Sequence, residues 1–193
     1  MPHRVTVFRQ GLKEAGFVED QNVAIEYRSD ERQTDRLPLL VADLLRRQVA
    51  LIVGFNTPPA LAAKAATTTV PIVFVTGGDP VRVGLVASLN RPGGNVTGVS
   101  FFSVELAAKQ LGLLRQLRPG AARIAVLVDP KFPTTERFVS EVRAAASAIG
   151  RQLIVLEVSS DREIETAFTT LVQRGAGALL WGTGAPNGNE LSR

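Results

Sequence analysis

Short apolar runs alternate along the chain with longer segments in which apolar residues recur every three or four positions. The runs are rich in Val, Ile and Leu, which is typical of strands buried on both faces of a parallel sheet. The longer segments have the spacing of amphipathic helices. The pattern predicts strands at 23–28, 50–54, 71–75, 96–100, 124–128, 153–158 and 178–181. It predicts helices at 4–15, around 37–45, at 57–66, 83–89, 103–117, 134–149 and 161–173.

This alternation of strand and helix predicts an α/β fold with parallel sheets. The strands could all form one sheet. The Pro/Gly loop at 90–95 and the weak strand after it nevertheless divide the chain into two similar halves. We therefore expect two Rossmann-like lobes joined near residues 99–103, an N-terminal lobe of residues 1–99 and a C-terminal lobe of residues 100–193.

Polar residues at the expected helix starts identify candidate caps. Thr34, Ser103 and Asp161 each precede or open an amphipathic segment, where a side-chain oxygen can accept from an unpaired backbone amide. Thr57 stands in the same position before an alanine-rich helix. These four residues are the expected N-caps.

Composition narrows the possible chemistry. The chain has 193 residues, 45% of them hydrophobic and 21% charged, which is ordinary for a folded globular protein. It contains no cysteine and one histidine, so a catalytic triad or a His/Cys metal site is improbable. The net charge is +4, but no Lys/Arg run exceeds Arg46-Arg47, so a nucleic-acid partner has little support. No membrane-spanning or secretory segment is expected, and these features favour a binding protein over an enzyme.

Small polar residues follow the expected strands, where ligands bind in open α/β sheets. They lie at 55–58, 76–80, 129–131 and 182–184. From this position Asn56 and Thr57 could receive a carboxylate or phosphate at a helix start. Gly77 and Gly78 could let the backbone approach a ligand, with Asp79 or Asp129 accepting from an ammonium or hydroxyl group.

Each of these residues also has a simpler structural interpretation. Thr57 could only cap its own helix, and Asp79 and Asp129 could only stabilise turns. Nucleotide-binding glycine motifs are absent from the sequence. Glu163 and Glu165 are expected to be solvated, and Trp181 to be a packing residue at a strand end.

Several sequence segments resemble the substrate-binding proteins of ABC-type importers, in particular the group that includes tryptophan- and tyrosine-type binders. The similarity is strongest at Gly78-Asp79-Pro80-Val81, at residues 84–89 and at Arg91-Pro92-Gly93-Gly94-Asn95-Val96-Thr97-Gly98. Weaker matches occur at 8–12, 16–28, 36–38, 60–67 and 71–74.

The resemblance implies a two-lobed periplasmic-binding-protein fold of type I, whose lobes close around a small organic solute. It implies no catalysis, cofactor or metal, an amino acid or related carboxylate as ligand, a membrane permease as partner, and a periplasmic or lipid-anchored extracellular location. Its ligand loops correspond here to Asn56 and Thr57, to Thr76, Gly77, Gly78 and Asp79, and to the segment from Asp129 to Thr134. Many relatives have Asn-Pro where this chain has Asp129-Pro130.

The family pattern also differs from this chain at both ends. The first strand of the fold is expected to be missing, and the second lobe to be partial, as in a fragment or a truncated gene product. Strands 23–28 and 50–54 would then flank an empty strand position, leaving Ile25, Leu51 and Val53 partly exposed unless the strands close up or a partner fills the slot. The alternatives to a solute receptor are an enzyme, the sensing domain of a regulator, and a fragment without function.

Overall fold

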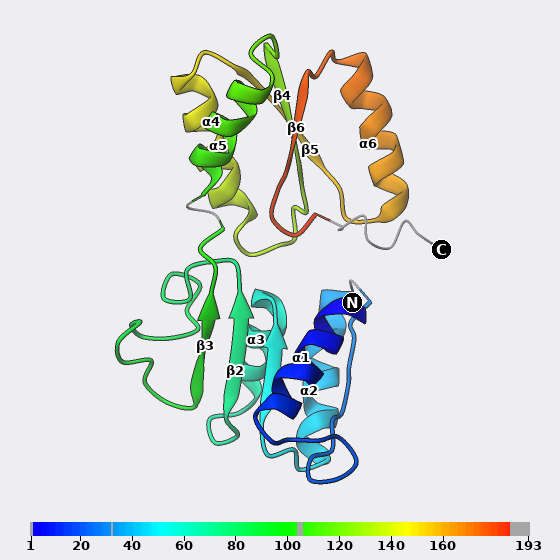
Figure 1. Ribbon diagram of the computed structural model, residues 1–193, viewed down its shortest axis with the longest axis vertical. Helices are drawn as coiled ribbons and strands as arrows, with labels where there is room; N and C mark the ends of the chain where they lie inside the picture. The colour runs from blue at the N-terminus through cyan, green and yellow to red at the C-terminus, as the bar shows by residue number, and fades with distance from the viewer. Residues whose placement is uncertain (1, 32, 104–105, 186–193) are drawn as a thin grey trace.

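The computed structural model describes residues 2–31, 33–103 and 106–185 and has two α/β lobes (Figure 1). Lobe one contains α1 (Pro2–Glu14), a 3-10 turn η1 (Thr34–Arg36), α2 (Leu37–Arg46), β1 (Ile52–Phe55), α3 (Thr57–Ala66), β2 (Ile72–Thr76) and β3 (Val96–Ser100). Lobe two contains α4 (Ala107–Leu117), β4 (Arg123–Val128), α5 (Thr135–Ala148), β5 (Gln152–Glu157), α6 (Asp161–Gln173) and β6 (Ala178–Trp181).

Each lobe is built on a three-stranded parallel sheet. The strand order is β1-β2-β3 in lobe one and β5-β4-β6 in lobe two. Ile52 pairs with Ile72 and Ile72 with Val96, so the three strands of lobe one end at the same edge. The prediction of an α/β fold with parallel sheets in two lobes is confirmed, and the single-sheet alternative is wrong.

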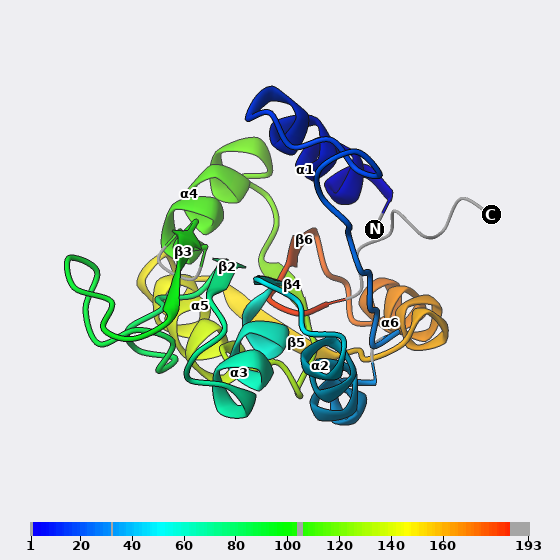
Figure 2. The same ribbon diagram turned by 90° about the horizontal axis from the view of Figure 1, so that it is seen from below.

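Lobe one buries one face of its sheet. Ile52, Ile72 and Phe74 lie on this face and pack against α2 and α3, where Ala60 and Ala63 are fully buried. The small alanines let α3 approach the sheet closely: a β-carbon on Gly54 would lie 2.9 Å from the backbone of Ala60. Seen from below, α1 lies on the other side of the sheet (Figure 2). Its Phe8 ring makes an edge-to-face contact with Phe55, with 5.7 Å between centroids.

Lobe two has helices on both sides of its sheet. The helices α4 and α5 lie together on one side and α6 on the other (Figure 1). Alternate β4 residues serve the two sides, so Ile124, Val126 and Val128 pack against α4 and α5. Leu127 belongs to the cluster under α6. This double coverage is why β4 is an uninterrupted apolar run.

The predicted strand at 23–28 is wrong. Val23 forms only an isolated bridge with Glu19, and residues 24–30 have no regular structure. The segment is held by side chains instead: Arg28 binds Asp43 of α2, and Arg9 of α1 binds both Glu19 and Tyr27. A β-prone sequence forms a strand only where a neighbouring strand pairs with it, and none does so here.

The predicted helix at 83–89 is also wrong. The segment forms turns in which the amides of Leu85 and Val86 donate to the Pro80 carbonyl. Gly84 has a φ of +77°, which interrupts a right-handed helix. Leu85 and Val86 are nevertheless buried, so their apolar character reflects packing against lobe one.

The predicted caps need correction. The N-caps of α2, α3, α4 and α6 are Arg36, Asn56, Leu106 and Ser160. Ser160 accepts from the Glu163 amide, and the Glu163 carboxylate accepts from the Ser159 amide. The arrangement is close to a capping box, except that the carboxylate binds the amide before the N-cap. Glu163 is exposed, as expected, and also stabilises the start of α6.

The free edge of β1 agrees with one of the three outcomes expected for an empty strand position. Among the described residues β1 pairs only with β2, so the segment at 23–28 does not close up against it. Leu51 is 47% exposed, and Ile25 and Val53 are half-buried. Partial exposure of these three side chains is therefore confirmed.

Replacing Asp43 by Asn should destabilise the protein at neutral pH. The Arg28 guanidinium hydrogen-bonds to Asp43 and, with Arg47, holds the pKa of that carboxyl below its ordinary value of 3.8. A carboxyl with a lowered folded-state pKa stabilises the fold above its unfolded-state pKa and loses this contribution as the pH falls through the folded-state value. The melting temperature of Asp43→Asn should therefore lie below that of the parent at pH 7, and the difference should shrink below about pH 4. Asp35→Asn, at an exposed position of η1, is the control, and a pH-independent difference for Asp43→Asn would contradict the prediction.

Candidate functional site

The loops that follow β1, β2 and β4 come together between the lobes. The carboxyl ends of the two sheets face each other (Figure 1), as the position of ligand sites in open α/β sheets requires. A β-carbon on Gly78 would lie 2.9 Å from Cγ2 of Thr134 and 3.9 Å from Oγ1 of Thr57. The structure therefore brings the three predicted loops to one place, with lobe one touching lobe two at Gly78.

On the side of lobe one, a hydrogen-bonded network joins the strand ends. The hydroxyls of Thr57 and Thr76 are 2.6 Å apart, and both side chains are buried. Oγ1 of Thr76 also accepts from the Gly78 amide at 3.2 Å. Oγ of Ser100 donates to the Gly78 carbonyl at 2.6 Å. The network fixes the backbone of Gly78 where it meets lobe two.

The surroundings of Gly77 and Gly78 leave no room for a β-carbon. A β-carbon on Gly77 would lie 2.7 Å from Oγ of Ser103, whose amide donates to the Gly77 carbonyl at 2.6 Å. This backbone bond is the role of Ser103, because α4 begins only at Ala107. The close contacts at these two glycines are made with protein atoms, so the predicted approach of their backbone to a ligand stays a prediction.

Asp79 and Asn56 have structural roles in their own turns. Oδ1 of Asp79 accepts from the amides of Val81 and Arg82, and Oδ2 lies 3.4 Å from Nε of Arg82. Its carboxylate thus stabilises its own turn, which is the structural alternative raised from the sequence. Asn56 has a φ of +83° and an exposed side chain, and it turns the chain from β1 into α3.

On the side of lobe two, Asp129 follows β4. Its Oδ1 accepts from the Lys131 amide at 2.9 Å and from Oγ of Ser159, which follows β5, at 3.1 Å. The Asp129 amide donates to the carbonyl of Thr183, which follows β6. Asp129 therefore joins the carboxyl ends of all three strands of this lobe.

Thr134 carries the most unusual polar atom in the described part of the chain. It is the N-cap residue of α5, yet its side chain makes no capping hydrogen bond. The residue is only 6% exposed, and its Oγ1 has no hydrogen-bond partner among the described residues. Burying an unpaired hydroxyl costs about 1–3 kcal/mol. Buried side-chain polar atoms without a partner are uncommon in folded proteins, so this hydroxyl calls for an explanation.

Sequence reasoning missed Ser100, Ser103 and Ser159 as members of this cluster. Ser100 and Ser159 each lie at the end of a strand, as the residues that were selected do. Applying the strand-end rule to β3 and β5 would have found both. Nothing in the sequence indicates the contact of Ser103 with Gly77.

Within residues 2–31, 33–103 and 106–185, no cluster of His, Cys, Asp and Glu side chains could hold a metal ion. In the same part of the chain, no helix combines the length and the hydropathy needed to cross a bilayer. Trp181 is half-buried and packs with the Leu127 cluster, as expected for a packing residue.

Comparison with protein families decides the classification. Residues 1–181 match the family model described as ABC transporter substrate binding protein. The chain belongs to this family. Members of the family are solute receptors and not enzymes, and they typically act in the periplasm or outside the cell.

Individual relatives agree with this classification. The chain is 28% identical over 166 residues to a tyrosine-binding protein of Clostridioides difficile strain R20291, covering 86% of this chain and 47% of that protein. A conserved domain protein from Vibrio cholerae has a TM-score of 0.80 at 25% identity, covering 89% of this chain and 57% of that one. A domain from Streptococcus pneumoniae in complex with L-Trp has a TM-score of 0.74 at 28% identity, with the same coverages. The chain thus spans about half the length of the relatives that it matches.

Proposed function

We propose that this chain captures a small organic solute, an amino acid or a related carboxylate, between its two lobes. The observation that carries the proposal is the buried, unpartnered hydroxyl of Thr134, at the point where Gly78 of lobe one contacts lobe two. A ligand that enters between the lobes would give this hydroxyl the partner that it lacks. Closure of the lobes around the ligand would be a hinge motion.

The polar groups around this point support an amino acid as the ligand. A carboxylate would be favoured by the dipoles of α3 and α5, which both begin here, since helix N-termini favour negative charge. An ammonium group would meet the Asp129 carboxylate, which is half-buried. Two of the relatives named above are a tyrosine-binding protein and a domain in complex with L-Trp, which supports an aromatic side chain on the ligand.

The proposed contact residues are those that the three loops contribute. The lobe-one side of the proposed site consists of Asn56, Thr57, Thr76, Gly77 and Gly78. Asp79 stabilises the turn that follows them. Asp129 and Thr134 form the lobe-two side. The division of the chain into two lobes joined near residues 99–103 is part of the same proposal.

The wider role follows from the family. We propose that the protein delivers its solute to an ABC-type permease in the membrane, without catalysing a reaction, from the periplasm or the outer face of the cell. The chain covers only about half the length of its relatives, so the activity of the whole protein is part of this proposal.

A thermal-shift screen against the amino acids, followed by calorimetric titration with L-tryptophan and L-tyrosine, tests the function. A ligand that binds only the folded state raises the melting temperature. No shift with any amino acid or small carboxylate would refute the proposal.

The substitution Thr134→Val tests whether the buried hydroxyl of Thr134 contacts the ligand. Because the variant removes a hydroxyl that is unpaired without ligand, it should keep or raise the melting temperature of the free protein. It should weaken ligand binding by about 5- to 150-fold, which corresponds to the loss of a buried hydrogen bond of about 1–3 kcal/mol. Thr166→Val, at an exposed position on α6, is the matched control and should change neither quantity. An unchanged dissociation constant for Thr134→Val would remove Thr134 from the site.

A further inference from the structure

The end of lobe two that points away from lobe one gathers arginines from three separate segments. The segments 115–124, 148–153 and 172–178 connect the helices α4, α5 and α6 to the starts of β4, β5 and β6. They contain five arginines and no Asp or Glu: Arg115, Arg118, Arg123, Arg151 and Arg174. These are five of the 22 Lys and Arg residues of the chain, and because the three segments contain no acidic residue, this end of lobe two is locally basic.

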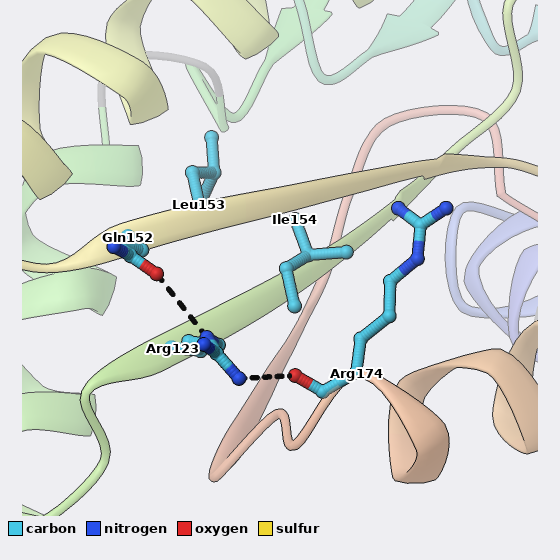
Figure 3. Close-up of a pocket in the computed structure, with 5 residues that line it drawn as sticks. All are labelled: Arg123, Gln152, Leu153, Ile154 and Arg174. Atoms are coloured by element: carbon cyan, nitrogen blue, oxygen red, sulfur yellow. Dashed lines mark hydrogen bonds between the residues drawn. The ribbon is translucent and has the colours of Figure 1, made fainter.

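Hydrogen bonds hold the three segments together. Arg123 donates through Nε to Oε1 of Gln152 at 3.2 Å and through Nη1 to the carbonyl of Arg174 at 2.9 Å (Figure 3). Arg151 donates to the Pro119 carbonyl at 2.6 Å. Two of the arginines at the basic end, Arg123 and Arg151, are therefore held in place by hydrogen bonds between the three segments.

A hollow of about 520 Å³ opens at this end, lined by Arg123, Gln152, Leu153, Ile154 and Arg174. Figure 3 shows the Ile154 side chain between those of Arg123 and Arg174, with the Arg174 guanidinium extended away from its own carbonyl. The hollow thus has an apolar floor and guanidinium groups at its rim. A planar guanidinium can bind a phosphate through two parallel hydrogen bonds.

Exposed aliphatic side chains stand beside the arginines. Leu117, in the last turn of α4, is 75% exposed, and Val172, in the last turn of α6, is 80% exposed. Basic residues at helix C-termini offset the helix dipole, which explains part of the arginine pattern. The helix dipole does not explain why large apolar side chains are exposed to solvent at the same helix ends.

We propose that this basic end of lobe two is a docking surface for an anionic phospholipid membrane. The arginines meet the negatively charged headgroups, the hollow receives a headgroup phosphate, and Leu117 and Val172 enter the boundary between headgroups and acyl chains. An anionic membrane matches both features, since a soluble acidic polymer would use the arginines and leave the aliphatic side chains without a partner. The surface lies at the starts of the strands and is separate from the proposed solute site at their ends.

Co-sedimentation with lipid vesicles tests the proposal on the whole chain. The protein should bind vesicles of equal parts phosphatidylglycerol and phosphatidylcholine, bind pure phosphatidylcholine weakly, and be released from the former at high salt. The triple variant Arg115→Gln, Arg118→Gln, Arg174→Gln should bind about 100-fold more weakly, at about fivefold for each charge near the surface. The triple variant Arg36→Gln, Arg46→Gln, Arg91→Gln makes the same change of charge in lobe one and should lose less than about threefold if the charges lie outside the contact. Equal losses for the two triple variants would overturn the proposal.

The aliphatic residues provide a second and independent test. Leu117→Ser with Val172→Ser should weaken vesicle binding at least about tenfold, because two apolar side chains no longer leave water. Leu39→Ser, at a position of α2 that is 74% exposed, is the matched control and should leave binding unchanged. Two results would refute a membrane surface and identify a polyanion surface. One is retained vesicle binding in the double variant, and the other is tighter binding to heparin or polyglutamate than to the anionic vesicles.

Discussion

Phe138→Ala should remove about 3–5 kcal/mol from the free energy of unfolding of lobe two. Phe138 is 2% exposed and lies in the cluster that joins α4 and α5 to β4 and β6. Removing a buried phenyl ring loses its transfer free energy and leaves a cavity that the neighbouring side chains fill only in part. Since domains of this size are stable by about 5–15 kcal/mol, the loss takes a large part of the total.

Urea denaturation followed by tryptophan fluorescence measures this effect. The sequence has a single tryptophan, Trp181, which lies at the end of β6 and so reports on lobe two. Phe168→Ala is the control, because Phe168 is 45% exposed on α6 and should cost much less. A loss below about 1 kcal/mol for Phe138→Ala would mean that α5 does not pack on the sheet as described.

Gly78→Ala should weaken ligand binding by about 5- to 150-fold while leaving each lobe folded. The added methyl group would lie 2.9 Å from Cγ2 of Thr134, which is too close for two carbon atoms. Overpacking of this kind costs about 1–3 kcal/mol. Because the contact joins the two lobes, the cost arises only when they are closed and so appears in binding. Titration with L-tryptophan or L-tyrosine measures it, and small-angle scattering of the free protein should show a larger radius of gyration.

A second substitution makes the Gly78 prediction specific. Thr134→Ser removes the methyl group that causes the overlap and keeps the hydroxyl, so the double variant should recover most of the lost affinity. Gly112→Ala, in α4, is the control, since a β-carbon there meets no atom within 4 Å and alanine favours the helix. Equal affinities for Gly78→Ala and the parent protein would show that ligand binding does not require this contact between the lobes.

Helices and strands with a local signal could be predicted from the residues alone. The apolar runs at 71–75, 124–128 and 178–181 coincide with β2, β4 and β6 to within one residue, because the strands of a parallel sheet packed against helices are rich in apolar side chains. The alternation of these runs with amphipathic helices was enough to predict parallel sheets. The strand-end rule then selected loops that the structure brings together at Gly78 and Thr134. The rule works without coordinates because parallel strands in one sheet all end at the same edge.

Features that depend on a contact with a distant part of the sequence became visible only in the folded chain. Residues 23–28 have the composition of a strand but form none, since no strand lies beside them to pair. Leu85 and Val86 are apolar because they pack on lobe one, and not because they form a helix. In the same way, Asp79 was shown to bind its own turn only when its oxygens were placed.

The burial of Thr134 and the clustering of the arginines are the strongest cases. The hydroxyl of Thr134 is buried without a partner among the described residues, and Gly78, more than fifty positions earlier in the chain, lies against the methyl group of the same side chain. The sequence shows no basic run longer than two residues, yet the fold places Arg118, Arg151 and Arg174 at one end of a sheet. Local patterns record the environment of a residue along its own helix or strand. Which residues from separate segments meet is decided by the packing of those elements on one another.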